Sequence, residues 1–385
     1  MSDPAPLPTV ALVWGQFGPY HRDRCEALTA HLQGRYRVVG IEIASHSDLS
    51  YDWSDVGGDF SRETLYPGKS WHQTTRWQRL KALVKALGRH GEGPVFLCHY
   101  DQFEIFLTAC WLRLKGRKVF GLHDSKFDDR PRSLWRELIK AALYLPYNGA
   151  LASGARAKDY LRFLGLAPSR VALGYDTLSL DRVRRLAGVP SAPEGAPFAA
   201  RQFLVIARFV EKKNLALALA AYDLYRQSAA APRSLVMIGS GPLESELQAE
   251  VARRNLAGVR FTGFLQEKAI AEFLGQGLAL VLPSTEEQWG LVINEALAMG
   301  LPILCSDNVG ARDDLVRIGV NGYVVEPDNA EGLAHLMDRI ATDEAEWRRL
   351  CQGSNALAPR ADVARFADAV ATLIGAEPAD KGARS

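Results

Sequence analysis

The segment from residue 278 to 305 constrains the fold more than any other part of the sequence. Its first apolar run, Leu278–Leu282, is followed at once by Pro and Ser, which is typical of a short buried strand. A polar loop with two adjacent glutamates leads to a helix expected over Gly290–Gly300, because glycine commonly stops a helix. The apolar run 301–305 is again typical of a strand. Strand, loop, helix and strand in this order predict an α/β fold with a parallel sheet.

The loop and the helix start of such a unit lie at the carboxyl edge of the sheet, where ligands bind. This edge would hold the carboxylate of Glu287 and the N–H groups of Gly290, Leu291 and Val292. The start of a helix suits a phosphate. Carboxylates such as Glu287 and Glu295 accept hydrogen bonds from hydroxyl groups. The combination predicts a site for a phosphorylated sugar, whereas either glutamate alone would more often be a solvated surface residue.

The spacing Glu287-x7-Glu295 has Gly-Leu-Val between the two acids and Ala-Leu-Ala-Met-Gly-Leu-Pro after them. This pattern resembles the signature of retaining GT-B glycosyltransferases of family 4, the glycosyl transferases group 1. The resemblance implies an α/β fold of two Rossmann-like parallel-sheet domains that face each other across a cleft. It also implies a hexosyltransferase that uses a nucleoside-diphosphate sugar as donor. The resemblance is specific over residues 200–340 and holds only in outline for the N-terminal half.

Arg208 and Lys213 follow an apolar run that is expected to be a strand. Their spacing matches the Arg-x4-Lys of the resembled family, in which two cations hold the donor diphosphate. Arginine can bind phosphate through two N–H groups, and lysine acts as a point charge. Lys212 fits the register less well. Without the downstream glutamates, both residues would be read as ordinary surface cations.

Three further candidates rest mainly on the resemblance. Gly15 and Gly18 lie in the loop after the first strand, where backbone can approach a donor closely, although the family commonly has adjacent glycines there. His123 ends a predicted strand, where the family places a histidine that meets the donor sugar or the acceptor. Phe264 lies where the family packs the nucleotide base. A lone histidine is otherwise most often structural, so both interpretations of His123 stand.

Proline and glycine are concentrated in residues 188–200, which predicts a domain boundary. The expected organisation is an acceptor-side Rossmann-like domain over 1–187, a linker over 188–200, a nucleotide-sugar-binding domain over 201–360, a helix over 361–375 that crosses back to the first domain, and a tail over 376–385.

Residues 45–75 lack periodicity and predict a long loop, for which contact with the acceptor is the preferred interpretation. A basic helix is predicted over 76–89, with one apolar face and several Lys and Arg residues elsewhere. Its simplest reading is a solvated face on a packed helix. The alternative is peripheral contact with an anionic membrane surface or a phosphorylated acceptor.

Composition narrows the class of protein. The net charge of +2 over 385 residues gives no indication of a nucleic-acid partner. Five cysteines without paired metal-like spacing fit a reducing compartment. No signal-peptide pattern and no apolar run of roughly 20 residues is present. The expected location is therefore cytoplasmic, and the alternative is peripheral contact with the inner face of the membrane.

The chain has no Asp-x-Asp motif, which in the other large glycosyltransferase fold binds a divalent metal. We therefore expect no cofactor and no metal, with His123, Arg208, Lys213 and Glu287 as the catalytic group. The resemblance implies transfer with retention by a front-face route, from a UDP- or GDP-sugar to a hydroxyl acceptor such as a glycan, a lipid-linked glycan or a small glycoside. Two alternatives remain: a sugar-nucleotide epimerase of the same fold, and a non-catalytic sugar-nucleotide-binding protein. Pyridoxal-phosphate-dependent phosphorylase chemistry would need a buried lysine that the sequence does not single out.

Overall fold

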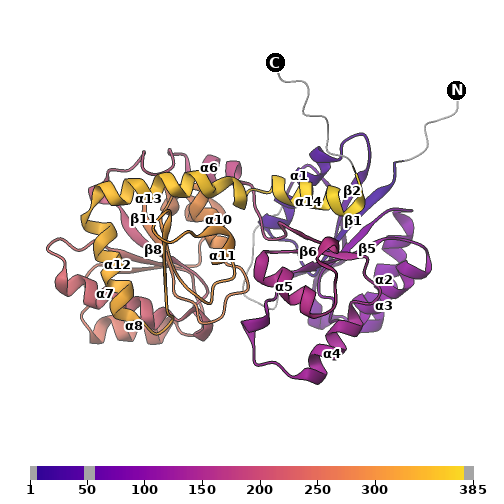
Figure 1. Ribbon diagram of the computed structural model, residues 1–385, viewed down its shortest axis with the longest axis horizontal. Helices are drawn as coiled ribbons and strands as arrows, with labels where there is room; N and C mark the ends of the chain where they lie inside the picture. The colour runs from indigo at the N-terminus through magenta and orange to yellow at the C-terminus, as the bar shows by residue number, and fades with distance from the viewer. Residues whose placement is uncertain (1–6, 47–56, 377–385) are drawn as a thin grey trace, which may run out of the picture. The chain divides into compact units, whose positions relative to one another are not determined.

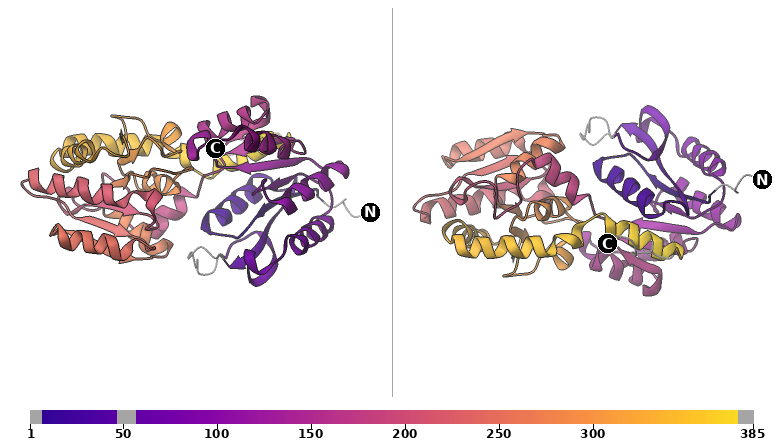
Figure 2. Two further views of the ribbon diagram at one scale, coloured as in Figure 1. Left: turned by 90° about the horizontal axis from the view of Figure 1, so that it is seen from below. Right: turned by 90° about the horizontal axis from the view of Figure 1, so that it is seen from above.

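The computed structural model describes residues 7–46 and 57–376 and divides the chain into two compact units. The first unit contains residues 1–177 and 363–385, and the second contains residues 178–362. Each unit is an α/β domain whose sheet strands are all parallel, with helices on both faces (Figures 1 and 2). The predicted fold class of two Rossmann-like parallel-sheet domains is confirmed.

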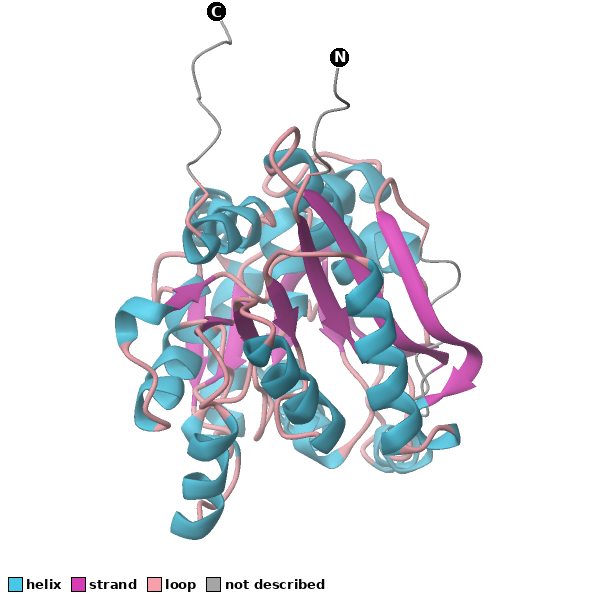
Figure 3. Ribbon diagram, turned by 90° about the vertical axis from the view of Figure 1, so that its right-hand side faces the viewer, coloured by secondary structure: helices cyan, strands magenta, loops and turns pink. Residues whose placement is uncertain are grey.

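The first unit has a seven-stranded sheet in the order β3-β2-β1-β4-β5-β6-β7. Figure 3 shows strands in magenta and helices in cyan. Its strands are β1 (Thr9–Trp14), β2 (Arg37–His46), β3 (Ser61–Ser70), β4 (Val95–Leu97), β5 (Val119–His123), β6 (Gly149–Ala152) and β7 (Val171–Leu173). Its helices are α1 (Pro19–His31), α2 (Arg76–Arg89), α3 (Phe103–Leu114), α4 (Leu134–Leu143), α5 (Ala155–Phe163) and α14 (Ala364–Ile374), with short 3₁₀ turns at η1 (Trp71–Gln73), η2 (Phe127–Asp129) and η3 (Pro168–Arg170).

Alternating side chains of β1 build a separate core on each face of this sheet. Val10, Leu12 and Trp14 pack on the face covered by α1 and α14. Ala11 and Val13 pack on the opposite face, with buried residues of α2, α3 and α5. Side chains of a strand point alternately to its two sides, so a fully apolar run fits a sheet that is covered on both faces.

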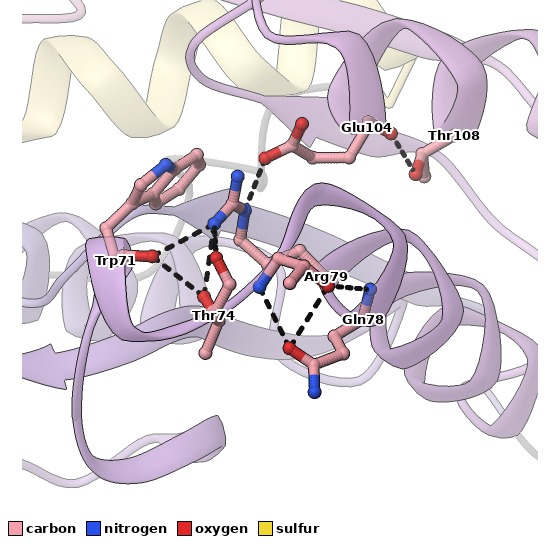
Figure 4. Close-up of polar contacts among 7 residues, drawn as sticks. Trp71, Thr74, Gln78, Arg79, Glu104 and Thr108 are labelled. Carbon is pink, nitrogen blue, oxygen red and sulfur yellow. Dashed lines mark hydrogen bonds and ion pairs between the residues drawn. The ribbon is translucent and has the colours of Figure 1, made fainter.

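Helix α2 is anchored by a buried arginine, which the sequence did not single out (Figure 4). Arg79 forms an ion pair with Glu104 of α3 and donates hydrogen bonds to the carbonyl oxygens of Trp71 (2.9 Å) and Thr74 (2.5 Å). Thr75 caps the helix by accepting a hydrogen bond from the Gln78 N–H. The predicted basic helix 76–89 is therefore present, but one of its cations is structural.

The predicted loop over residues 45–75 is wrong in part. β3 and η1 occupy most of its described portion, and residues 47–56 lie outside the described residues. β3 pairs with β2 and is the edge strand of the sheet. Because its side chains are mostly exposed or half-buried, they carry no apolar alternation that would have identified the strand. The predicted tail also falls outside the described residues from 377 onward.

The second unit has a six-stranded sheet in the order β10-β9-β8-β11-β12-β13. Its strands are β8 (Gln202–Ile206), β9 (Leu235–Ile238), β10 (Val259–Gly263), β11 (Gly277–Leu282), β12 (Ile303–Ser306) and β13 (Gly322–Val325). Its helices are α6 (Leu180–Ala187), α7 (Leu215–Ser228), α8 (Glu244–Arg253), α9 (Glu267–Gly275), α10 (Leu291–Ala298), α11 (Arg312–Leu315), α12 (Ala330–Thr342) and α13 (Glu344–Leu357), with 3₁₀ turns at η4 (Phe198–Ala200), η5 (Glu211–Lys213) and η6 (Ala358–Ala361).

The units divide between Thr177 and Leu178, not at the Pro/Gly-rich segment 188–200. α6 packs on α9 and α10 of the second unit, and its Arg182 lies 2.7 Å from Glu267. The Ala192 N–H donates to the Met299 carbonyl oxygen at 2.8 Å, so the Pro/Gly-rich segment is also fastened to that unit. Composition marked a loop there, whereas packing decides where the units separate. At the other end, α14 packs on α1 and belongs to the first unit.

Candidate functional site

The strand order of the second unit creates a topological switch point between β8 and β11. From β8 the chain proceeds outward through β9 to β10, and from β11 it proceeds in the opposite direction through β12 to β13. The loops that leave β8 and β11 therefore diverge at the carboxyl edge of the sheet, which is where ligands bind in open α/β sheets. Arg208 and Lys213 lie in the first of these loops and Glu287 lies in the second.

Lys213 and Glu287 meet directly at this switch point. The Lys213 Nζ forms an ion pair with the Glu287 Oε2, and both side chains are only about one-seventh exposed, at 15% and 14%. The Ser284 hydroxyl donates a hydrogen bond to the same carboxylate oxygen at 3.3 Å. Beside this pair, Lys212 lies 3.5 Å from Glu286, and both of these side chains are more exposed. The structure therefore brings two of the four predicted catalytic residues into contact.

Backbone hydrogen bonds hold the two loops together. The Thr285 N–H donates to the Lys212 carbonyl oxygen at 2.9 Å. The Asn214 side-chain amide donates to the carbonyl oxygens of Pro283 (3.1 Å) and Pro327 (2.6 Å). Asn214 has a φ of 52°, a left-handed conformation that asparagine tolerates better than most residues. These contacts fix the position of Lys213 relative to Glu287 through the main chain as well as through the ion pair.

Two glycines shape the loop that carries Glu287. The Gly310 N–H donates to the Glu287 carbonyl oxygen at 3.0 Å, and a Cβ at residue 310 would lie 1.8 Å from the Gln288 carbonyl oxygen. Gly290 has a φ of +101°, which L side chains rarely adopt. Gly310 was missed in the sequence because its partner is the backbone of another loop.

Helix α10 begins directly after Gly290, and the N–H groups of Leu291 and Val292 lie in its first turn. The first N–H groups of a helix have no partner within the helix and form a site of positive potential. Glu295 lies one turn further along and is 9% exposed. The predicted elements of the donor site (a helix start and a carboxylate) thus belong to one helix at the switch point.

Arg208 is half-buried in the loop after β8, and this loop is pinned to the loop after β9. The Phe209 N–H donates to the Ser240 carbonyl oxygen at 2.9 Å. A Cβ at Gly239 would lie 1.9 Å from the Ala207 carbonyl oxygen, so only glycine permits this approach. Phe264 is half-buried and directly follows β10, two strands away from β8. Both residues occur at the same carboxyl edge, and their proposed roles remain predictions.

His123 belongs to the first unit, where it ends β5 and is 2% exposed. Its Nδ1 lies 2.7 Å from the Tyr144 hydroxyl, and its ring lies 5.6 Å from that of Tyr100 and 5.7 Å from that of Tyr160. Burial lowers the pKa of His123 to about 3, and the positive charges of Lys140 and Arg132 act in the same direction. His123 is therefore a neutral imidazole at physiological pH and would serve as a hydrogen-bonding group.

Gly15 and Gly18 follow β1 in the first unit. The Gly15 carbonyl oxygen accepts a hydrogen bond from the Ala44 N–H at 2.9 Å, and the Gly18 N–H donates to His21 Nδ1 at 2.8 Å. A Cβ at Gly15 would lie 3.0 Å from the Nε2 of His99, which follows β4. Both glycines therefore have local structural partners, and donor binding by them stays a prediction.

His99 is a candidate that sequence reasoning missed. It has a φ of 58°, and its ring lies 5.8 Å from that of Trp71. The pKa of His99 is raised to about 9, mainly by the neighbouring Cys98 and also by the Asp124 and Asp101 carboxylates. A protonated imidazole next to Gly15 would place a positive charge at the carboxyl edge of the first sheet. Its position after a strand was the available signal, as it was for His123.

Metal ligands are not assembled in the described parts of either unit. Among residues 7–46 and 57–376, no group of three or more His, Cys, Asp or Glu side chains could hold a metal ion. Metal-independent chemistry nevertheless remains a prediction. In the same residues, no helix is both long enough and apolar enough to cross a bilayer.

Two solved structures illustrate the fold that this chain shares. Sucrose-phosphate synthase from Thermosynechococcus elongatus matches with a TM-score of 0.72 and 20% identity, over 95% of this chain and 98% of that one. Anabaena HepE, solved in complex with UDP, matches with a TM-score of 0.70 and 15% identity, over 96% and 100% of the two chains. At these identities the likeness establishes the GT-B fold.

The second unit matches a known family. Residues 192–356 match the family described as glycosyl transferases group 1. The switch-point residues from Arg208 to Glu295 all lie within the matched segment.

Curated relatives match over part of their length. The α-D-kanosaminyltransferase of Streptomyces kanamyceticus is 30% identical over 120 residues, 31% of each protein. The glycogen synthase of Mycobacterium tuberculosis is 31% identical over 162 residues, 40% of this chain and 38% of that one. The D-inositol 3-phosphate glycosyltransferase of Streptomyces griseus is 29% identical over 238 residues, 55% of this chain and 50% of that one. The matches thus span between about a third and a half of these relatives.

Proposed function

We propose that this protein is a retaining, metal-independent glycosyltransferase that moves a sugar from a nucleoside-diphosphate sugar to a hydroxyl acceptor. The observation that carries the proposal is the Lys213–Glu287 ion pair at the switch point of the family-matched unit. It puts a cation for phosphate and a carboxylate for hydroxyl groups at the edge where α/β domains bind ligands. A binding site for a sugar that carries a phosphate needs both.

The cations provide the electrostatic part of the mechanism. Negative charge develops on the diphosphate as the bond to the anomeric carbon breaks. Arg208, Lys213 and the opening of α10 are the groups that would meet this charge, without the reorganisation that water would need. Because Lys213 is already paired with Glu287, an incoming diphosphate would compete for the ammonium group. Donor binding would then release Glu287 to accept hydrogen bonds from sugar hydroxyls.

The carboxylates would orient the sugar. Glu287 and Glu295 would act as hydrogen-bond acceptors for its hydroxyl groups, so neither is assigned as a covalent nucleophile. In the front-face route, the departing phosphate oxygen helps to remove the proton of the acceptor hydroxyl as the new glycosidic bond forms on the same face. His123, held neutral by burial, would offer a hydrogen bond to the donor sugar or the acceptor.

The donor is proposed to be a UDP-sugar first and a GDP-sugar second. HepE has been solved with UDP, with UDP and glucose, and with UDP-glucose. These ligands belong to HepE, and they favour uridine for this chain by analogy of fold alone. The acceptor is proposed to be a glycan, a lipid-linked glycan or a small glycoside. The exposed cations of α2 (Arg76, Lys81 and Lys85) are suited to an anionic acceptor or membrane surface.

A transfer assay tests the proposal against its two alternatives. The purified protein is incubated with UDP-glucose or GDP-mannose, with and without a panel of hydroxyl acceptors. The products are separated by chromatography, and NMR identifies each sugar and its anomeric configuration. A transferase gives free nucleoside diphosphate that depends on acceptor, and an α-linked donor gives an α-linked product. An epimerase would change the sugar without any acceptor, and a binding protein would stabilise thermally with the nucleotide yet form no product.

A further inference from the structure

Helix α4 of the first unit has its amphipathic faces reversed. Four large apolar side chains are exposed: Leu134 by 72%, Trp135 by 77%, Leu138 by 52% and Ile139 by 61%. The one acidic residue of the helix, Glu137, is 5% exposed and faces inward. A helix on the surface of a water-soluble domain normally buries its apolar stripe and exposes its charges.

A polar cluster under the helix fixes this orientation. The Glu137 carboxylate accepts hydrogen bonds from the Tyr160 hydroxyl (2.5 Å), Lys140 Nζ (3.0 Å) and Arg132 Nη1 (3.4 Å). The Arg132 guanidinium also lies 4.4 Å from the centre of the Tyr160 ring. Turning the apolar face inward would break this cluster and remove the carboxylate that accepts the hydrogen bond of the buried Tyr160 hydroxyl. The exposed apolar face is therefore built into the fold.

The four side chains lie close together. They occupy positions i, i+1, i+4 and i+5, which share one side of a helix. No other helix or strand in the described residues packs closely along α4, which lies at the edge of its unit (Figure 1). A contiguous exposed apolar patch of this kind marks an interaction surface.

The charges around the patch indicate its partner. Arg130 and Arg136 are exposed, and neither forms an ion pair within the described residues. Arg136 belongs to α4 itself, and Arg130 lies four residues before the first residue of the helix. The exposed carboxylate of Asp128, which also precedes the helix, is already paired with Lys126 and Arg156. The apolar patch is therefore flanked in the sequence by two cations that have no acidic partner in the described residues.

We propose that α4 docks the protein onto an anionic lipid surface, independently of the proposed transferase activity. Leu134, Trp135, Leu138 and Ile139 enter the interfacial region, and Arg130 and Arg136 contact the phosphate groups of the lipids. A symmetric contact with a second copy fits less well, because a two-fold axis brings the same arginines of both copies together.

Vesicle co-sedimentation of the full chain tests the proposal. The lipids are phosphatidylcholine alone and phosphatidylcholine with one-third phosphatidylglycerol. We expect binding to the anionic vesicles, and a decrease of roughly tenfold or more in apparent affinity for the variant Trp135→Ser/Ile139→Ser, because two apolar anchors are lost. Arg136→Gln should weaken binding less, and added salt should weaken it in the parent protein. The matched control Leu224→Ser/Ile318→Ser removes exposed apolar residues from the second unit and should bind as the parent does.

Three results would overturn the proposal. The first is equal binding to both vesicle types, which would remove the anionic partner. The second is unchanged anionic binding by Trp135→Ser/Ile139→Ser. The third is the absence of binding to either vesicle type. If, in addition, the parent forms dimers and this variant does not, the apolar face is an interface with a second copy. Thermal stabilisation by UDP is measured on the same variant and should equal that of the parent. Failure of the membrane proposal can therefore be distinguished from failure of the proposed function.

Discussion

Burial of His123 has a measurable consequence for stability. The folded protein holds its pKa at about 3, whereas an unfolded histidine has a pKa of about 6.5. Between these two values the unfolded chain binds one proton more than the folded chain at this residue. Stability is therefore unaffected by His123 above pH 6.5 and decreases as pH falls towards 3.

The magnitude follows from linkage. One proton of difference changes the free energy of unfolding by about 1.4 kcal/mol per pH unit, which integrates to about 2 kcal/mol between pH 7 and pH 5. Replacing His123 with Phe keeps an aromatic ring in the cluster and removes the titrating group. The loss of its hydrogen bond with Tyr144 adds a cost that does not depend on pH in this range. The difference between parent and variant should thus shrink by about 2 kcal/mol over this interval.

Equilibrium urea unfolding at pH steps from 7 to 5 provides the assay, with amide hydrogen exchange in β5 to report on the first unit. Desolvation also lowers the pKa of His21, so the pH dependence of the parent alone would combine two histidines. The difference in the free energy of unfolding between parent and variant isolates His123. His335→Gln, at an exposed position of α12, is the matched control and should keep the parental slope. Parallel pH profiles for the parent and His123→Phe would refute the reasoning, because they would mean that folding does not shift the pKa of His123.

Three further predictions concern the switch point. Gly310→Ala puts a methyl group 1.8 Å from the Gln288 carbonyl oxygen, so the Glu287 loop must move by about 1 Å or more and kcat/KM should fall on the order of 100-fold. Gly88→Ala, which meets no atom within 4 Å, is its control, and equal activity of the two variants would contradict the prediction. A double-mutant cycle of Lys213→Met and Glu287→Gln, measured by urea unfolding, should give a coupling of about 1 kcal/mol, and additive effects would mean that the pair does not form in solution. Treatment with EDTA should leave the initial transfer rate unchanged. If EDTA abolishes activity and only added Mg²⁺ restores it, Arg208 and Lys213 are not sufficient to stabilise the departing diphosphate.

The central motif was predictable because its signals are local. The strand β11, the loop and helix α10 follow from an apolar run, a proline and two glycines within about twenty residues. The roles of Ser284 and Gly310 were not predictable, since both depend on contacts with Glu287 and its neighbours that only the folded loops create.

Helix α4 shows a second limit of sequence reasoning. A helix from Leu134 to Tyr144 is predictable from apolar periodicity. The periodicity indicates that one face of the helix is apolar, but it does not indicate whether that face is turned to the core or to solvent. Here Glu137 is turned inward by hydrogen bonds from Lys140, three residues along the same helix, and from Tyr160, 23 residues away on α5. The second contact exists only in the folded domain. Edge strand β3 is a related case, because a mostly exposed strand has no apolar face to reveal it.

Calorimetric titration of UDP into the parent protein and two single variants tests the central claim most directly. Lys213→Ala removes the cation that meets Glu287, and Lys212→Ala removes its more exposed neighbour, which pairs with Glu286. We expect UDP to bind the parent. Lys213→Ala should weaken binding roughly tenfold or more through loss of a charge-assisted contact, and Lys212→Ala should change the affinity by less than about threefold. Equal affinities for the parent and Lys213→Ala would contradict the assignment of the switch point as the site of the donor phosphates.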